Sequence, residues 1–369
     1  MIEKKDIQHL AYIDSLRGIA ILMVIVVHAA QIVFHPSPLA TILSKGAYGV
    51  QLFFIVSALT LFLSYEQRKI VDGRQTNYFF LIRRFFRIAP AFYLAIALYT
   101  CAFFLKNYIL GTNSVTFDWI QLLTFSAFLG VLYPASMYLL PFGGWTVQVE
   151  MFFYIFIPFL FKLLSTKKRA IYFFVVSWLG YLALERILMS LETTAFQPYL
   201  VFQNQIPVFA LGIILYHILR ENTAVVKRSY LFSIELGVYL GLIFLLSKWT
   251  SLLSETILIS LFFSGLILLM SSKKIPLLQN KITMLYGKVS YSLYLWHFII
   301  ILFFWYIYRV TSHFWGAPQL LSFVIIYFTT ALIGLLVSWF SFNYLEKPGI
   351  NLGKKIIQNY TQNLHHEKN

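Results

Sequence analysis

Long apolar runs constrain this chain more than any other feature of its sequence. The hydrocarbon core of a bilayer is about 30 Å thick, and a helix that rises about 1.5 Å per residue needs roughly 20 mostly apolar residues to cross it. Ten runs in the chain meet this requirement. We therefore predict an all-α fold, a polytopic transmembrane helical bundle. The predicted spans lie at about 13–34, 47–65, 79–106, 145–164, 170–188, 198–219, 230–247, 252–270, 288–310 and 319–344.

The composition agrees with a membrane protein and excludes two other classes. Hydrophobic residues make up 59% of the 369 residues and charged residues only 12%, whereas a soluble globular domain carries about 25% charged residues. This excludes a soluble enzyme and a disordered protein. The single cysteine, Cys101, excludes an internal disulfide framework and a multi-cysteine metal site. We expect no metal ion and no permanently bound cofactor.

The formal net charge of +15 would suit a nucleic-acid partner, but the positions of the basic residues explain it differently. Most lysines and arginines fall in the N-terminal tail, the loops after the second, fourth, sixth and eighth spans, and the C-terminal tail. Cytoplasmic loops of membrane proteins carry this excess. We therefore predict that both termini are cytoplasmic, that the basic face contacts anionic headgroups of the lipid bilayer, and that no nucleic acid is bound.

The apolar runs and the basic residues also predict the domain organisation. We expect a single transmembrane domain over residues 1–350 and a short basic cytoplasmic tail over 351–369. No extracytoplasmic domain is expected, because only the short tail follows the last span. The oligomeric state is left open.

Two polar residues in the first run are candidates for function. Arg17 and His28 are 11 residues apart, close to three helical turns, so they share one helix face about 16 Å apart along the axis. A charged side chain near the bilayer centre costs at least about 2.5–3.5 kcal/mol, which makes such a residue a functional candidate. Alternatively, Arg17 reaches the cytoplasmic headgroups and His28 is a buried, hydrogen-bonded histidine. Asp14, three residues before Arg17, is placed to pair with it across one turn.

Further charged candidates lie near the start of the third and fourth runs. Arg84 and Arg87 are three residues apart and project from one side of a helix. Arginine suits bidentate recognition of phosphate, although ordinary anchoring at the cytoplasmic face is an alternative. Glu150, near the outer start of the fourth run, must be paired, protonated or exposed to a water-filled cavity.

The last two candidates are His297, in the ninth run, and Glu346, at the end of the tenth. His297 lies near the middle of the ninth run, where an ionisable side chain indicates function. Glu346 lies at the cytoplasmic boundary of the tenth, where it is placed to form an ion pair with Lys347. We expect Pro348 to end that helix, because proline breaks the backbone hydrogen-bond ladder.

Six segments, in order along nearly the whole chain, resemble the membrane acyltransferase-3 family. YIDSLRGIAILMVIVVHA resembles the family's first helix, a basic residue followed after ten residues by histidine, which Arg17 and His28 match. GVQLFFIVSALTLFL resembles the FFxxSG segment, with Ala58 where glycine is usual, and RRFFRIAPAFY carries the arginine-x-x-arginine motif in Arg84 and Arg87.

The remaining three segments complete the resemblance. WTVQVEMFFY resembles the family's WSLxxExxFY segment through Trp145 and Glu150, with Thr146 in place of the usual serine. GKVSYSLYLWH and FNYLEKP resemble the last two signatures of the family. Each segment alone is a weak signal, but six in the right order across ten predicted spans are a strong one.

The resemblance implies a membrane enzyme that takes an acyl group, most often acetyl, from cytoplasmic acyl-CoA. It would transfer that group to a hydroxyl of a carbohydrate acceptor, such as a cell-surface polysaccharide, lipopolysaccharide or lipid-linked glycan precursor, at the cell (inner) membrane. Many members of the family carry an extracytoplasmic SGNH-type domain that completes the transfer, which we do not find here. Either the protein acylates its acceptor directly or a separate protein receives the acyl group.

The resemblance and the spacing together suggest a mechanism. We expect Arg17, Arg84 and Arg87 to hold the phosphates of acyl-CoA, and His28 and Glu150 to be catalytic. The Arg17–His28 spacing is of the same order as the pantetheine arm of CoA. His28 would act as a general base on the acceptor hydroxyl or form an acyl-histidine intermediate. Glu150 would orient the acceptor or His28, or balance its charge. Substrate contact or structural support is expected from Asp14, Trp145, His297 and Glu346.

A proton-coupled transporter or flippase is the main alternative function. In that case His28, Glu150 and His297 would form a proton relay. Related halves with interrupted helices are typical of such transporters, and the sequence shows no such internal symmetry. A non-enzymatic scaffold is disfavoured, because it would retain costly buried charges without using them.

Overall fold

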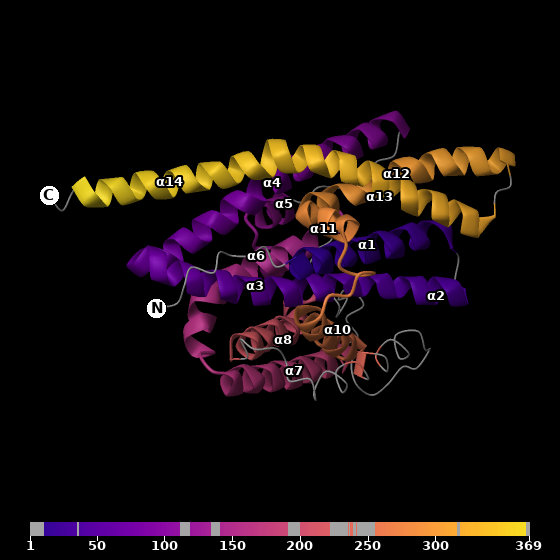
Figure 1. The fold of residues 1–369 in the computed structure, drawn as a ribbon. Coiled ribbons are helices and arrows are strands. Elements are labelled where there is room, and N and C mark those ends of the chain that lie inside the picture. The colour runs from indigo at the N-terminus through magenta and orange to yellow at the C-terminus, as the bar shows by residue number, and fades with distance from the viewer. Residues whose placement is uncertain are drawn as a thin grey trace.

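The computed structural model describes residues 11–34, 37–110, 119–133, 141–190, 200–221, 255–315 and 318–366, with four isolated positions between 235 and 241. All regular structure in these residues is helical (Figure 1), which confirms the all-α prediction. The helices are α1 (Ala11–Val33), α2 (Pro38–Ser44), α3 (Gly49–Asp72), α4 (Thr76–Leu110), α5 (Trp119–Ser126), α6 (Gly144–Leu163), α7 (Lys167–Ser190), α8 (Phe202–Glu221), α10 (Glu255–Ser272), α11 (Lys281–Lys288), α12 (Ser290–Trp315), α13 (Gln319–Ser341) and α14 (Lys347–His366).

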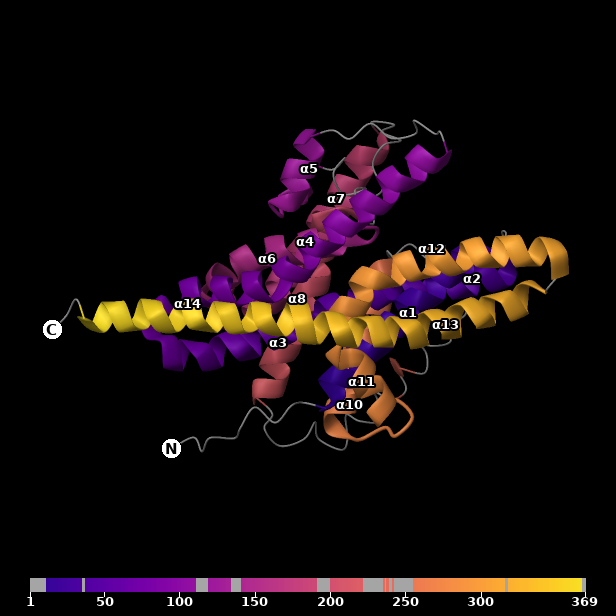
Figure 2. The ribbon, with the colours of Figure 1, turned by 90° about the horizontal axis from the view of Figure 1, so that it is seen from above.

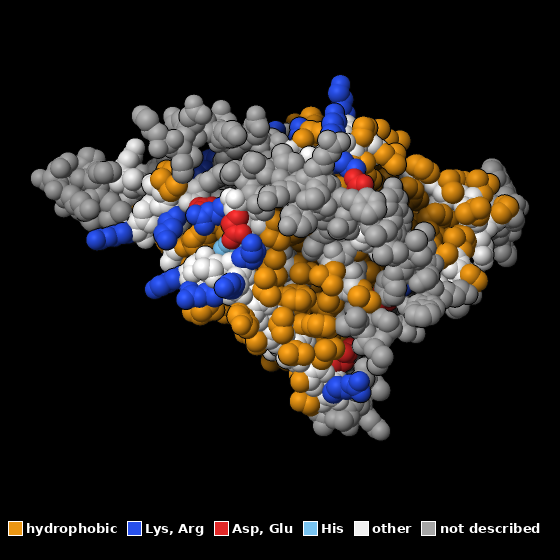
Figure 3. Space-filling view, turned by 60° about the horizontal axis from the view of Figure 1, so that its bottom comes forward, with side chains coloured by type: hydrophobic (Ala, Val, Ile, Leu, Met, Phe, Trp, Pro, Cys, Tyr) orange, Lys and Arg blue, Asp and Glu red, His pale blue; other side chains and the backbone are white. Residues whose placement is uncertain are grey.

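Eight helical stretches among the described residues are long and apolar enough to cross a membrane. One of them, Pro38–Leu105, contains α3 and most of α4, which correspond to the second and third predicted spans. Figure 3 shows a broad field of hydrophobic side chains on one face, as expected for a surface that meets lipid. The chain is therefore a polytopic helical bundle. The seventh predicted span, 230–247, falls almost wholly outside the described residues and stays a prediction.

The bundle is centred on α1 and α3 (Figures 1 and 2). Helix α1 contacts α3, α11, α12 and α13, and α3 also packs on α8, which in turn packs on α7 and α10. Helix α14 continues from α13 and lies along α4. Several polar side chains of these two helices, such as Ser15 on α1 and Gln51 and Ser57 on α3, are consequently buried inside the bundle.

Ion pairs join the helix ends at one end of the bundle. Arg220 on α8 pairs with Glu66 on α3 at 2.9 Å, and Lys167 at the start of α7 pairs with Glu221 at the end of α8 at 2.5 Å. Such exposed pairs contribute at most about 1 kcal/mol each. Lys and Arg side chains gather toward one end of the hydrophobic field in Figure 3. That the basic end faces the cytoplasm stays a prediction from the distribution of charge.

A very close contact between α1 and α11 fixes the position of α1. A Cβ atom added at Gly287 would lie 1.8 Å from the backbone oxygen of Asp14, and one added at Gly18 would lie 2.0 Å from the backbone oxygen of Thr283. Only glycine permits this approach, because the opposing atoms belong to the backbone of a packed helix. The contact holds α1 beside the start of α12, and both helices contribute to the site described below.

Pro348 does not end the last helix, contrary to the prediction from sequence. A π-helical turn over Phe342–Glu346 joins α13 to α14, and the chain stays helical to His366. Proline lacks the backbone N–H and its ring crowds the carbonyl four residues earlier. The wider π turn immediately before Pro348 relieves that conflict. The residues predicted to be a tail are therefore helical over most of their length.

The α1–α11 contact predicts a specific loss of stability. We expect Gly287→Ala to lower the Tm of the detergent-purified protein by several degrees, because overpacking against a rigid backbone costs about 1–3 kcal/mol. Gly180→Ala on α7 is the matched control, since a Cβ atom there meets nothing within 4 Å. The control should leave the Tm unchanged or slightly raised. Equal Tm values for the two variants would contradict the proposed role of the contact.

Candidate active site

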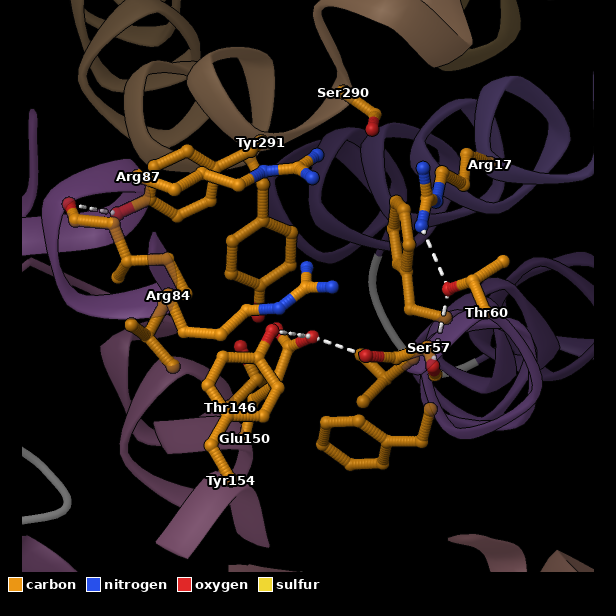
Figure 4. A pocket seen from close by; sticks show the side chains of 16 residues that line it. Arg17, Ser57, Thr60, Arg84, Arg87, Thr146, Glu150, Tyr154, Ser290 and Tyr291 are labelled. Atoms are coloured by element: carbon orange, nitrogen blue, oxygen red, sulfur yellow. Dashed lines mark hydrogen bonds between the residues drawn. The ribbon is translucent and has the colours of Figure 1, made fainter. Parts of the chain in front are cut away.

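A pocket of about 740 Å³ lies between α1, α3, α4, α6 and α12. It brings together four of the residues singled out in the sequence, namely Arg17 from α1, Arg84 and Arg87 from α4, and Glu150 from α6. Figure 4 shows the three arginine side chains converging on this pocket from two helices. We call it the arginine pocket. Residues 70 positions apart in the chain thus meet in one cavity, as the predicted phosphate-binding role requires.

The arginines are held by hydroxyl groups and aromatic rings. The Arg17 guanidinium donates a hydrogen bond to Thr60 Oγ1 at 3.1 Å, and Arg84 Nη2 donates to Ser64 Oγ at 3.0 Å. The Arg84 guanidinium also lies 5.7 Å from the centre of the Tyr154 ring, a cation–π contact. Across the described ranges, none of the three arginines in the pocket forms an ion pair with a carboxylate.

Glu150 is the single acidic residue among those that line the arginine pocket. Its Oε1 accepts hydrogen bonds from the hydroxyls of Ser57 and Tyr154, the latter at 2.6 Å (Figure 4). Three guanidinium groups and one carboxylate leave a formal excess of two positive charges on the lining. In an apolar bundle such an excess is costly, so the pocket is suited to an anionic ligand.

Among the described residues, Asp14 and Arg17 interact through their charges but form no direct ion pair, contrary to the prediction. The Arg17 guanidinium turns toward Thr60 on α3. Asp14 is buried at the start of α1, where its backbone carbonyl packs against Gly287. The prediction is wrong because sequence spacing places two residues on one helix face but does not give the polar partners that neighbouring helices offer.

His28 does not line the arginine pocket, although it lies on the same unbroken helix as Arg17. Its ring centre is 5.4 Å from that of His297 and 4.1 Å from that of Phe298. Its Nδ1 lies 2.9 Å from the side-chain oxygen of Gln31. His297 is fully buried, with Nδ1 2.7 Å from the backbone oxygen of Tyr294. We call His28 and His297 the imidazole pair.

Tyr294 connects the arginine pocket to the imidazole pair. It lines the pocket, and its ring centre lies 5.4 Å from that of His297. Its hydroxyl donates to the backbone oxygen of Gly143 at 3.0 Å. Gly143 has a left-handed φ of +79°, and a Cβ atom there would come 3.0 Å from the Tyr294 hydroxyl. Glycine at this position therefore lets the start of α6 approach Tyr294 closely.

Trp145 and Glu346 are buried and have structural contacts. The Trp145 ring packs edge-on against Phe54, with the ring centres 6.3 Å apart. Glu346 accepts a hydrogen bond from Ser292 on α12. The predicted ion pair between Glu346 and Lys347 is therefore wrong: Glu346 faces the interior, whereas Lys347 is exposed at the next position of the helix.

Sequence reasoning missed the hydroxyl-bearing residues of the arginine pocket. Each lies within an apolar run, where a serine, threonine or tyrosine gives a much weaker signal than a charge. One usable signal was spacing, because a residue four positions after Glu150 or three before His297 lies on the same helix face. The missed lining residues with hydroxyl groups are Ser57, Thr60, Tyr154, Ser290, Tyr291 and Tyr294.

The charge balance of the pocket predicts a salt-dependent loss of stability. Glu150→Gln keeps the size of the side chain and its carbonyl acceptor but removes the negative charge. We expect its Tm to fall below that of the parent at low ionic strength, because the guanidinium groups then repel one another without compensation. The deficit should shrink as salt is added, since ions screen that repulsion.

Glu185→Gln on α7 is the matched control for this experiment. Glu185 also accepts a hydrogen bond from a tyrosine on its own helix, Tyr181, at 2.7 Å, but it does not line the arginine pocket. Its Tm difference from the parent should not depend on salt in the same way. A Glu150→Gln protein with the parental Tm at every salt concentration would refute the proposed charge balance.

Comparisons with known proteins identify the family of this chain. Residues 10–340 match the acyltransferase domain of the acyltransferase-3 family. A Rhizobium radiobacter protein named "Protein 2 in picA locus" is 33% identical over 137 residues, which cover 36% of this chain and 68% of that protein. A Staphylococcus aureus (strain COL) protein named "Putative O-acetyltransferase" is 24% identical over 385 aligned positions, which cover 96% of this chain.

The same comparisons also define the extent of the likeness. The alignment covers 59% of the length of the Staphylococcus aureus relative, so this chain corresponds to a little over half of that protein. No solved structure matches the chain. The family's domain nevertheless covers nearly the whole chain, and the fold is a bundle of apolar helices. The chain therefore belongs to the acyltransferase-3 family and is a multi-pass membrane protein.

Proposed function

We propose that the protein is an O-acyltransferase of the cell (inner) membrane that uses cytoplasmic acyl-CoA, most often acetyl-CoA. The acceptor is a hydroxyl of a cell-surface polysaccharide, lipopolysaccharide or lipid-linked glycan precursor. One observation carries the proposal: the arginine pocket has an excess of positive charge inside a membrane bundle. The name of the Staphylococcus aureus relatives, O-acetyltransferase, supports acetyl as the transferred group and oxygen as its acceptor.

The donor side of the proposal rests on the chemistry of the arginines. CoA is a polyanion, and guanidinium groups bind phosphate oxygens through paired, charge-assisted hydrogen bonds. Arg84 and Arg87 lie within the first three turns or so of α4, close to the basic end of the bundle, whereas Arg17 lies across the pocket on α1. Phosphate groups bound there would neutralise the excess charge. The thioester would then point away from the basic end, along the pocket.

The acceptor side of the proposal rests on the imidazole pair. His28 lies toward the far end of α1, about 16 Å from Arg17 along the helix axis, a distance of the same order as the pantetheine arm. Tyr294 stands between the pocket and His297, so the acyl group must pass it to reach His28. In this proposal His28 acts as a general base on the acceptor hydroxyl or as a transient acyl carrier.

Glu150 has a narrower role in this proposal than the sequence suggested. It lines the arginine pocket, whereas His28 does not. Its carboxylate is already bound by Ser57 and Tyr154. We therefore assign Glu150 to balancing the guanidinium charge around the donor and not to orienting His28.

A direct assay tests the proposed reaction. The purified protein is incubated with labelled acetyl-CoA and a panel of glycans, and both the release of free CoA and the label on each glycan are measured. We expect CoA release that depends on an acceptor and label that appears on one class of glycan. Proton-coupled uptake into proteoliposomes without acyl-CoA, and without CoA release, would instead support the transporter alternative.

The arginines should control the affinity for the donor. We expect the double variant Arg84→Gln and Arg87→Gln to raise the KM for acetyl-CoA at least about tenfold, which corresponds to a loss of about 1.4 kcal/mol. The KM for the glycan should change little. Arg169→Gln is the matched control, since Arg169 is exposed at the start of α7 and does not line the pocket. An unchanged KM for acetyl-CoA in the double variant would indicate that these arginines anchor the helix at the membrane surface and do not bind the donor.

His28 should control turnover and not donor binding. We expect His28→Ala to reduce glycan acylation at least about 100-fold, the lower end of typical contributions from acid–base catalysis. Binding of acetyl-CoA should persist, because His28 lies outside the arginine pocket. Membrane insertion, measured by fractionation, serves as the control. Undiminished acylation in this variant would show that His28 is not catalytic.

A further inference from the structure

A second hollow adjoins the arginine pocket on the side of the basic helix ends. It has a volume of about 1310 Å³ and is lined by the last turns of α3, the first turns of α4 and one face of α14. Arg84 and Arg87 line both cavities. We call it the outer hollow. A ligand long enough to pass these two arginines would therefore occupy both spaces at once.

The lining of the outer hollow is strongly cationic. Its acidic residue, Asp72, is already bound by both terminal nitrogens of Arg83. Arg68 on α3 and Lys354 on α14 add two further positive charges to those of Arg84 and Arg87. Within the described residues neither Arg68 nor Lys354 is paired with a carboxylate. The hollow is therefore suited to a ligand with several negative charges.

Helix α14 is fixed against α4 and holds Lys354 at this position. Near its end, the Tyr360 ring packs on the rings of Tyr78 and Phe79, with centres 5.4 and 5.9 Å apart. At the position directly before Lys354, Gly353 packs so closely on Phe86 that an added Cβ atom would lie 2.9 Å from the Phe86 side chain. The contacts pair late residues of α14 with early residues of α4, so the helices are antiparallel and α14 forms a wall of the hollow.

We propose that the outer hollow binds the nucleotide end of acyl-CoA, with Lys354 and Arg68 contacting its phosphate groups. This inference rests on acyl-CoA being the donor, as proposed above. CoA consists of a pantetheine arm joined through a diphosphate to adenosine with a further 3′-phosphate. That order matches the two cavities: the pantetheine arm lies in the arginine pocket, the diphosphate at Arg84 and Arg87, and the 3′-phosphoadenosine in the outer hollow.

The shape of the cavities favours a nucleotide over a lipid headgroup. A phospholipid would have to direct its acyl chains outward into the bilayer, whereas the outer hollow shares Arg84 and Arg87 with the arginine pocket, which lies inside the bundle. The C-terminal helix then acts in donor recognition through Lys354, a residue outside every segment that resembles the family's signatures.

A binding experiment on the detergent-purified full chain tests this inference. The Kd for labelled acetyl-CoA is measured for the parent, Lys354→Gln, Arg68→Gln and Lys355→Gln. Lys355 is the matched control, because it is the next residue on α14, is also exposed, and does not line the hollow. We expect Lys354→Gln and Arg68→Gln each to weaken binding about 5- to 10-fold, as for one lost charge-assisted contact. Lys355→Gln should bind like the parent.

Acetyl donors that lack part of CoA show which part of the ligand Lys354 and Arg68 contact. Acetyl-pantetheine lacks the nucleotide, so its turnover should be the same in the parent, Lys354→Gln and Arg68→Gln. With 3′-dephospho-acetyl-CoA the penalty of Lys354→Gln or Arg68→Gln should become smaller, because one phosphate has been removed. An equal loss for acetyl-pantetheine would overturn the inference, since it would mean that these variants damage the pocket itself.

Three results separate the possible failures. If the parent does not bind acetyl-CoA, the proposed function fails and the inference fails with it. If the parent binds and the Arg84 and Arg87 variants lose affinity, while Lys354→Gln and Arg68→Gln do not, the proposed function stands and the inference is overturned. If Lys354→Gln and Arg68→Gln instead lose affinity only for vesicles that contain anionic phospholipid, the hollow is a lipid site and the inference is again overturned.

Discussion

Three guanidinium groups and one carboxylate lie together inside an apolar bundle. The rest of the structure depends on this excess of positive charge. An arginine in hydrocarbon is costly unless it is solvated, hydrogen-bonded or paired. Here Thr60 and Ser64 accept from Arg17 and Arg84, and the Tyr154 ring lies beneath Arg84. These contacts satisfy part of the hydrogen-bonding capacity of the guanidinium groups but leave their charge uncompensated. Under our proposal, an anionic donor substrate supplies the missing charge while it is bound.

The polar features of the protein follow one another through the bundle. The outer hollow and the arginine pocket share Arg84 and Arg87, and Tyr294 lines the pocket and contacts the ring of His297. Under our proposal this order separates the two substrates, with the donor at the basic end and the acceptor at the other. The glycine contact between α1 and α11 contributes to this order, because it fixes the helix that carries both Arg17 and His28.

The sequence predicted those features that depend on local chemistry. Apolar runs predicted the helices, because crossing a bilayer requires a fixed length of apolar helix. Charges within those runs predicted Arg17, Arg84, Arg87 and Glu150, which the fold brings into one pocket. The spacing of Arg84 and Arg87 also predicted that both would project from the same side of their helix, and both line that pocket.

Features that depend on contacts between helices could not be predicted in the same way. Arg17 bonds to Thr60 and not to Asp14, and Glu346 bonds to Ser292 and not to Lys347, because the partners come from helices distant in sequence. The helix continues through Pro348 because a π turn precedes it, which no propensity indicates. The separation of His28 from the arginine pocket is likewise a result of packing, since the spacing along α1 alone allowed both to face one cavity.

The most direct test of the central claim is an experimental structure of the protein with a non-hydrolysable acetyl-CoA analogue, determined by cryo-electron microscopy. We predict density for the phosphate groups at Arg84 and Arg87, with the acetyl end beyond them in the arginine pocket, directed toward Tyr294. Density for the analogue at any site that does not touch these arginines, or an arginine pocket filled by another ligand while the analogue is bound elsewhere, would contradict the claim.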